Sequence, residues 1–245
     1  MRTAVDLHIH SCLSPCADED MTPCNITAMA ALKGLGAIAV TDHNSGGNAA
    51  AAAAAGAARG LLVVPGVEVT TREEIHALCY FPAQDALADF IGWLEGGRSR
   101  LKNRPDTFGR QLYMSAEDRV TGEEPLYLPA ATEFALETVE AEALARGGVL
   151  VPAHIDRPSF SLLASLGMIP AALRARTFEA AGDPPAGLAD YRYLRSSDAH
   201  TLGAILEPTF FLDLRELSAA AVVEALREPM SVRSVPGCTS CDLGN

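Results

Sequence analysis

Short apolar runs recur along the chain, and several of them end in histidine or an acidic residue. The first run, residues 4–11, alternates apolar and polar positions, which predicts a β-strand. Alternate side chains of a strand point the same way, so one face of this strand carries three polar groups: Asp6, His8 and His10. Further apolar runs predict strands at residues 37–41, 61–67, 74–81, 149–153, 177–179, 191–195 and 209–214.

Helical stretches separate these strands. Thr22 can cap, and Pro23 can begin, a helix that runs to about Lys33. Further helices are predicted over residues 48–59, 132–146 and 218–227. Strands that alternate with helices favour an α/β fold with a parallel sheet. Apolar strands that end in polar residues favour a (β/α) barrel, because the active site of such a barrel lies at the carboxyl ends of its strands.

Residues 83–146 follow a different pattern. Mixed charge at helical spacing leads into a stretch rich in Pro, Gly and Glu, and a helix follows it. We interpret this segment as a small, mainly helical insertion that caps the site. The barrel is then discontinuous, formed by residues 1–82 and 147–236, and residues 237–245 form a Cys-containing tail.

Composition is ordinary for a globular protein, with 49% hydrophobic and 20% charged residues among 245. The formal net charge of −12 disfavours a surface that grips long nucleic acid by counterion release. A small anionic substrate in a metal-lined pocket is compatible with this charge. We therefore expect a small phosphorylated substrate and no long duplex nucleic acid as partner.

The chain starts directly with a predicted strand and has no apolar run of the roughly 18 residues that a membrane span needs. We expect a cytoplasmic protein with no membrane partner. Its six cysteines are then not expected to form a disulfide framework. Cys238 and Cys241 have the C-x-x-C spacing of a zinc or redox motif, but a single pair in a tail is more often incidental.

The six histidines share one property: each lies in or at the end of a predicted strand, beside an acid or another histidine. They are His8, His10, His43, His76, His154 and His200. An isolated His-x-His is more often part of a core, but scattered core histidines would not follow this pattern. Neutral imidazole and carboxylate are the usual ligands of Zn²⁺, Mn²⁺ and Fe²⁺. The pattern therefore predicts a metal site.

Taken together, these motifs resemble the PHP (polymerase and histidinol phosphatase) superfamily of metal-dependent phosphoesterases. The matching segments are Asp6-Leu7-His8-Ile9-His10-Ser11, Thr41-Asp42-His43, Gly66-Val67-Glu68-Val69, His76, Pro152-Ala153-His154 and Ser197-Asp198-Ala199-His200. The resemblance implies a distorted, TIM-like (β/α)7 barrel with two or three divalent ions at its strand ends.

The resemblance also implies which residues hold the ions. One ion takes four ligands: His8, His10, Glu68 and Asp198. Glu68 bridges to a second ion, which His76 and His154 complete. A third takes His43, His200 and a ligand from the loop after the first motif. Relatives often carry His or Asp at the position that is Pro15 here, so we assign Asp18, with Asp20 or Cys16 as alternatives. The ligand types leave the metal open among Zn, Mn and Fe.

Such a cluster suits hydrolysis of a phosphate ester. Two cations roughly 3.5–4 Å apart lower the pKa of a shared water, and the resulting hydroxide attacks phosphorus. We count Glu68, Asp198 and Asp42 as catalytic residues, with Asp42 orienting a ligating histidine. Arg157 is expected to clamp the substrate phosphate, the alternative being a surface salt bridge to Asp156 or to an acid on a helix.

The function expected from these residues is hydrolysis of a small phosphomonoester, such as a nucleoside bisphosphate or an oligonucleotide end. Two alternatives stay open: histidinol-phosphate phosphatase, and a metal-binding PHP module without catalytic activity. The sequence does not define the oligomeric state.

Overall fold

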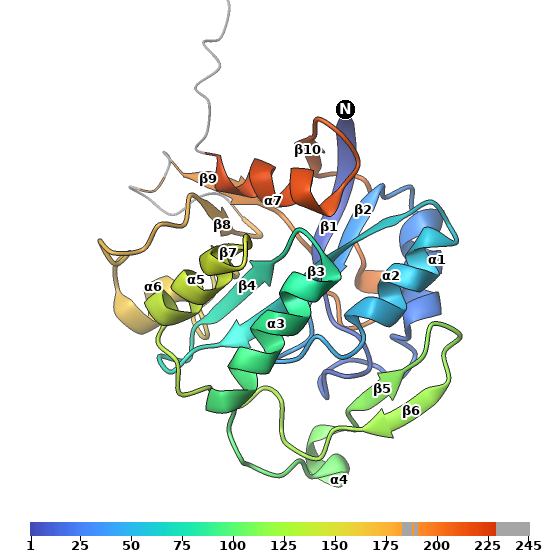
Figure 1. Ribbon diagram of the computed structural model, residues 1–245, viewed down its shortest axis with the longest axis horizontal. Coiled ribbons are helices and arrows are strands. Elements are labelled where there is room, and N and C mark those ends of the chain that lie inside the picture. Colours follow the sequence, from blue (N-terminus) through green and yellow to red (C-terminus); the bar gives the residue numbers. More distant parts are fainter. Residues whose placement is uncertain (183–187, 189–190, 229–245) are drawn as a thin grey trace, which may run out of the picture.

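The computed structural model describes residues 1–182, 188 and 191–228 (Figure 1). The expected Cys-containing tail, with Cys238 and Cys241, lies outside these residues.

The centre of the fold is a curled six-stranded sheet with the order β10-β1-β2-β3-β4-β7 (Figure 1). Its strands are β1 (Arg2–Ile9), β2 (Ala37–Val40), β3 (Leu62–Thr70), β4 (His76–Tyr80), β7 (Val149–Pro152) and β10 (Phe211–Asp213). β1, β2 and β3 are parallel, whereas β10 runs antiparallel to β1 at the sheet edge. The predicted α/β class is confirmed.

A pair of short parallel strands, β8 (Thr177–Glu179) and β9 (Arg192–Leu194), continues the curl. The backbone N–H of Ile155, just beyond β7, donates to the carbonyl of Glu179 (2.8 Å). At the other side of the sheet, His10 N–H donates to the carbonyl of Ala199 (2.9 Å). The curl is consistent with a distorted barrel, but a count of seven β/α units is not confirmed.

β4 departs from the parallel arrangement, because it pairs antiparallel with both β3 and β7. The connection from Thr70 to His76 is a tight turn, in which Thr71 N–H donates to the carbonyl of Ile75 (2.9 Å). A parallel pair would need a crossover of a dozen or more residues. His76 therefore lies at the start of its strand, yet at the same end of the sheet as the carboxyl ends of β1, β2 and β3.

Four longer helices cover the outer face of the sheet (Figure 1). They are α1 (Pro23–Leu32), α2 (Ala49–Ala57), α3 (Gln84–Leu94) and α5 (Leu136–Ala145). A fifth, α7 (Ala219–Arg227), lies across the end of the sheet where β1 begins and packs in one cluster with Leu7 and Tyr80. The predicted cap at Thr22 is confirmed, because its hydroxyl accepts from Asn25 N–H (3.4 Å). The hydroxyl of Ser218 likewise caps α7 by accepting from Ala221 N–H (3.2 Å). Within the described part of the chain, no helix combines the length and the hydropathy needed to cross a bilayer.

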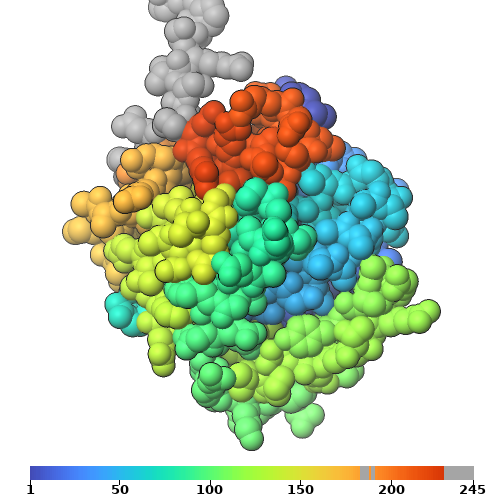
Figure 2. All heavy atoms as spheres, viewed as in Figure 1, coloured from blue at the N-terminus to red at the C-terminus, as the bar shows by residue number. Residues whose placement is uncertain are grey.

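The segment 83–146 contains more than helices. α3 and α5 pack against the sheet through buried side chains such as Phe90 and Val139. Between them lie η1 (Glu95–Gly97), the short α4 (Pro105–Phe108) and a hairpin of β5 (Leu112–Met114) and β6 (Val120–Glu123). Figure 2 shows this hairpin projecting below the helices that cover the sheet. The remaining short helices are α6 (Leu162–Leu166) and η2 (Leu202–Ala204).

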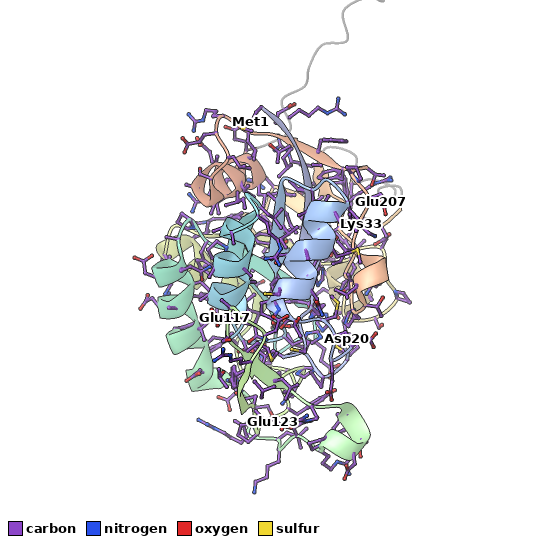
Figure 3. The ribbon with its side chains drawn as sticks, turned by 90° about the vertical axis from the view of Figure 1, so that its right-hand side faces the viewer. Met1, Asp20, Lys33, Glu117, Glu123 and Glu207 are labelled. Carbon is purple, nitrogen blue, oxygen red and sulfur yellow. The ribbon has the colours of Figure 1, made fainter. Side chains whose placement is uncertain are left out.

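The hairpin is fastened to the loop that follows β1. Leu112 N–H donates to the carbonyl of Cys12 (2.9 Å), and Cys24 N–H donates to the Asp118 carboxylate (2.8 Å). Asn48 donates from its side chain to the carbonyl of Leu112 (3.0 Å). Figure 3 shows Glu123 on this hairpin and Asp20 on the loop toward one end of the molecule, with Met1 at the opposite end.

Replacing Phe90 by Ala tests the contact between α3 and the sheet. Phe90 is fully buried, and its ring centroid lies 4.9 Å from that of Phe81. Because the truncation leaves a cavity, we expect the free energy of unfolding to fall by about 3–5 kcal/mol. Urea denaturation followed by circular dichroism measures it. Leu32→Ala, at an 81% exposed position, is the control and should cost less than about 0.5 kcal/mol. Equal stability of the two variants would contradict the packing described here.

Candidate active site

The strand ends that carry the predicted site residues surround a cavity of about 220 Å³. Its lining includes Glu68, Asp198, Arg157 and four of the histidines: His43, His76, His154 and His200. A larger cavity of about 570 Å³ lies between α2, α3 and Tyr113, but it shares no lining residue with the first. The polar strand ends converge on the smaller cavity.

Glu68, at 1% exposure, is the centre of this arrangement. Five imidazole nitrogens approach its carboxylate: His43 and His76 at 2.9 Å, His8 at 3.3 Å, His10 at 3.4 Å and His154 at 3.6 Å. Despite these distances, neither Glu68 oxygen accepts a hydrogen bond from any described residue. Buried polar atoms that approach without hydrogen-bond geometry fit a group that binds cations.

Three sets of ligand atoms lie within 4.8 Å of one another: His8, His10 and Asp198; His43, Glu68 and His76; and His10, His43 and His200. Asp198 Oδ1 is 3.2 Å from His8 Nε2 and 3.1 Å from His10 Nε2. His154 Nε2 is 3.3 Å from His76 Nδ1. The structure thus brings together eight of the residues that the sequence singles out as ligands, and each set could hold an ion.

Glu179 is a functional candidate that the sequence did not reveal. Its carboxylate lies 3.0 and 3.1 Å from His8 Nδ1 and also accepts from the backbone N–H of His154 (3.0 Å). With a proton on Nδ1, His8 presents Nε2 to Glu68 and Asp198, so Glu179 fixes both the tautomer and the ring orientation. The available signal was an acid at the end of the weak predicted strand 177–179.

Asp42 acts on His10 through Ser14. The Ser14 hydroxyl donates to Asp42 Oδ1 (2.7 Å) and lies 2.9 Å from His10 Nδ1. Ser11 gives Asp42 two further hydrogen bonds, from its N–H (2.8 Å) and its hydroxyl (2.6 Å). These bonds occupy the Asp42 carboxylate, which therefore positions a histidine rather than facing the cavity.

Asp6 does not join the histidines that share its strand face. Its carboxylate accepts from the N–H and hydroxyl of Ser197 (3.0 and 2.6 Å) and from the N–H of Leu206 (2.9 Å). It thereby holds the loop that presents Asp198 and His200. Convergence of Asp6 with His8 and His10 on one point is not observed, because the loop amides are nearer partners for this carboxylate.

The loop after β1 places Cys16, not Asp18, beside the cluster. Asp18 is exposed, and its backbone N–H donates to the carbonyl of His200 (2.9 Å). Cys16 is exposed as a residue, but its thiol lines the cavity, and Sγ lies 3.5 Å from His43 Nε2. Desolvation raises the pKa of this thiol, but hydrogen bonding to His200 and His43 lowers it to about 7.

Arg157 pairs with a site carboxylate rather than with its neighbour Asp156. Its NH1 lies 2.6 Å from Asp198 Oδ2, and its side chain remains 47% exposed. Asp156 instead accepts from the backbone N–H groups of Ala181 (3.1 Å) and Gly182 (2.9 Å). Arg157 thus stands at the cavity with part of its guanidinium accessible.

Backbone strain is concentrated at this site. Four of the six positive-φ residues other than glycine in the described chain lie in or beside it: Asn44 (φ 47°), His154 (φ 30°), Phe160 (φ 53°) and Asp198 (φ 52°). Such conformations cost about 1–3 kcal/mol each and persist where the surroundings enforce them. The strained positions at His154 and Asp198 aim ligand atoms at Glu68 and its neighbours.

Neighbouring charges shift the pKa values of the groups in this cluster. Burial alone would raise the pKa of Glu68, but the neighbouring imidazoles, first His76, hold it well below its usual range. Burial opposes protonation of His8 and His43, yet acidic neighbours raise the pKa of His8 well above normal and that of His43 to about 10. Burial, and then His43, lower the pKa of His10 to about 3. A cation bound here would displace protons, so its affinity falls as the pH falls.

No family model and no curated protein matches the chain. Solved structures do match. The lesion-specific endonuclease PfuEndoQ from Pyrococcus furiosus has a TM-score of 0.61 at 17% identity, covering 93% of this chain and 56% of the other. A protein from Bifidobacterium adolescentis, assigned as a metal-dependent phosphoesterase, has a TM-score of 0.56 at 20% identity, covering 81% and 88% of the two chains. Endonuclease Q in complex with a 27-mer duplex substrate, with an abasic lesion at its active site, has a TM-score of 0.62 at 18% identity, covering 93% and 57%.

These matches show a shared fold. The chain has the fold of a protein assigned as a metal-dependent phosphoesterase and of an endonuclease, as expected from the resemblance to the PHP superfamily. The chain spans little more than half the length of the endonuclease.

One expectation is wrong: net charge does not exclude long duplex nucleic acid as a partner. The endonuclease with this fold holds a 27-mer duplex. Net charge sums over the whole surface and does not report the local potential at the cavity where a phosphate would bind.

Replacing Glu179 by Gln tests its action through His8. The Gln side chain can still accept a hydrogen bond from His154 N–H, but it carries no charge to stabilise the hydrogen bond from His8 Nδ1. We therefore expect the affinity of the protein for Zn²⁺ or Mn²⁺ to fall about 10–100-fold. Isothermal titration calorimetry measures this affinity, with Glu137→Gln on the exposed face of α5 as the matched control. Unchanged affinity in Glu179→Gln would show that this carboxylate does not position a ligand.

Proposed function

We propose that this chain is a metal-dependent phosphoesterase. The observation that carries the proposal is the buried Glu68 carboxylate, whose oxygens accept no hydrogen bond from the described residues although five imidazoles approach them. A cation between carboxylate and imidazole nitrogens satisfies both, because both are lone-pair donors. Carboxylate and imidazole together suit Zn²⁺, Mn²⁺ or Fe²⁺.

The distances between ligand atoms support two ion positions. His8, His10 and Asp198 surround one position, with Glu68 beside them. Glu68, His76 and His154 surround a second. Divalent ions at such positions lower the pKa of a bound water and offset the charge of phosphate oxygens. Glu68 and Asp198 are thus catalytic by supplying negative ligands, and Asp42 supports them by fixing His10 through Ser14.

Arg157 is proposed to bind the substrate phosphate. It is the arginine that lines the cavity, and it is half exposed. A guanidinium offers two parallel N–H donors to phosphate oxygens, and its pairing with Asp198 keeps it aimed at the site until substrate arrives. The same donors would stabilise charge that develops on phosphate in the transition state.

The size of the cavity fits a single phosphate group better than a whole substrate molecule. A volume of about 220 Å³ lies below the roughly 300–1,000 Å³ of pockets that enclose whole ligands, so a phosphate would enter while the remainder of the substrate stays outside. Phe160, 46% exposed at the rim, offers an aromatic face to that remainder. We therefore propose a phosphomonoester of nucleotide type, such as a nucleoside bisphosphate or an oligonucleotide end.

A second candidate is cleavage of a phosphodiester in damaged duplex DNA. The similarity to endonuclease Q, whose complex holds a duplex with an abasic lesion, favours it. The chain covers 57% of that endonuclease. Any contact that the rest of the endonuclease makes with DNA would therefore have no counterpart in the matched part of this chain.

The test is a comparison of substrates. Protein loaded with Mn²⁺ or Zn²⁺ is assayed for phosphate release from nucleoside 3′,5′-bisphosphates, short oligonucleotides, histidinol phosphate and sugar phosphates, and for nicking of a duplex with an abasic site. We expect release from a nucleotide-type monoester, lost with chelator and reduced at least about 100-fold in Glu68→Gln. Glu117→Gln, exposed on the hairpin, is the control.

Each result decides between functions. Nicking without phosphate release would favour the phosphodiester candidate, and release from histidinol phosphate alone would favour that phosphatase. Metal binding without turnover of any substrate would contradict a phosphoesterase and leave a binding module.

Replacing Arg157 by Ala tests the phosphate clamp. Loss of the guanidinium removes donors to the phosphate, so we expect kcat/KM to fall about 10²–10³-fold with metal content unchanged. Steady-state kinetics and metal analysis measure the two quantities. The control is Arg72→Ala, whose side chain is 66% exposed and pairs with Glu73. A kcat/KM in Arg157→Ala within about twofold of the parent would refute the clamp.

A further inference from the structure

We propose that Cys16 is a metal ligand and that its thiolate, with His43 and His200, forms a third cation position that selects zinc. This inference rests on the proposed metal centre and specifies one part of it. It replaces the carboxylate of Asp18, which the sequence favoured for this position.

The geometry places the thiol beside His43 and in the same cavity as His200. Cys16 Sγ lies 3.5 Å from His43 Nε2. His43, His200 and His10 already present ligand atoms within 4.8 Å of one another. All three of Cys16, His43 and His200 line the cavity of about 220 Å³.

The ring orientation of His200 also fits a ligand. Its Nδ1 lies 2.7 Å from the backbone carbonyl of Asp198, which accepts a hydrogen bond when Nδ1 carries the proton. Nε2 is then available to a cation. The ring stacks on that of His10, with centroids 4.4 Å apart, and this contact keeps His200 within the cluster.

Hydrogen bonds on both sides of Cys16 hold the loop that carries it. On one side of it, the Ser14 hydroxyl is fixed by Asp42 (2.7 Å). On the other, Asp18 N–H donates to the carbonyl of His200 (2.9 Å). The loop that carries the thiol is therefore tied at both ends to the elements that carry the ligating imidazoles.

The inserted segment presses on the same loop. Gly109 has φ +97°, and a Cβ at this residue would come within 2.3 Å of the carbonyl oxygen of Pro15. Only glycine permits this close approach of two backbones. The backbone immediately before Cys16 is thus packed against the segment that carries Gly109, which restricts movement of this part of the loop in that direction.

A thiolate changes the metal preference of the position. Thiolate is a soft donor that favours Zn²⁺, whereas Mn²⁺ prefers oxygen ligands. The other two positions carry carboxylate oxygen from Glu68 or Asp198 and no sulfur. We infer a mixed centre, in which Mn²⁺ can occupy the carboxylate positions while the position at Cys16 takes Zn²⁺.

Cobalt substitution tests this directly. Co²⁺ replaces Zn²⁺ and gives visible d–d absorption in any such site, but a thiolate-to-cobalt charge-transfer band in the near ultraviolet only when sulfur is bound. The parent protein for these spectra carries Cys238→Ser and Cys241→Ser, so that the C-x-x-C pair does not contribute. Cys16→Ser and Cys24→Ser are then introduced separately into this parent. Cys24→Ser is the matched control, because the Cys24 thiol donates to the carbonyl of Ala116 (3.0 Å), away from the site.

We expect the charge-transfer band in the parent and in Cys24→Ser, and its loss in Cys16→Ser while d–d absorption from the other positions remains. Visible d–d bands without a charge-transfer band in the parent would overturn the thiolate ligand but leave the metal centre standing. A band that survives in Cys16→Ser would also overturn it. Absence of any cobalt spectrum would overturn both this inference and the proposed centre.

A second variant measures selectivity. Cys16→Asp supplies a hard ligand in the same loop, so we expect the preference for Zn²⁺ over Mn²⁺ at this position to fall at least about tenfold in competition titrations. An unchanged preference would show that the residue at position 16 does not choose the metal.

Discussion

The structure depends on one buried carboxylate. Glu68 lies at 1% exposure, and none of the described residues donates a hydrogen bond to it. A buried charge of this kind is tolerated only when positive charge is close. In the protein alone, protons on His8 and His43 supply that charge, and a divalent ion can supply it instead. The requirement explains why imidazoles from several strands meet at this point.

Each imidazole must also be held in one orientation, and the groups that hold them come from distant parts of the chain. Glu179 fixes His8, and Ser14 fixes His10. Asp6 binds Ser197 across 191 residues of sequence and so holds the last ligand loop. The contacts that orient these imidazoles are therefore the same contacts that join distant segments around the curled sheet. The fold and the site stabilise each other through them.

The sequence predicted the parts that follow from local periodicity: the strands, the helix cap at Thr22, and the histidines and acids at strand ends that the fold brings together. It did not predict the direction of the strand that begins at His76, because apolar periodicity is the same in parallel and antiparallel strands. The sequence did not indicate a role for Glu179, because it is a single acidic residue on a short strand. Spacing favoured Asp18 over Cys16, but the conformation of that loop depends on the packing of Gly109 against it. Tertiary contacts decide such cases, and one sequence does not display them.

The tight turn between β3 and β4 has a consequence for how the site assembles. Glu68 and His76 belong to one hairpin, with Thr70 paired opposite His76, so they meet without closing a long loop of chain. Asp198 and His200 reach the first strand only after nearly the whole described chain is in place. Loop-closure entropy is small for the hairpin and larger for the distant segment. One half of the histidine cluster is thus a local structure, and the other half forms only when the end of the described chain reaches the first strand.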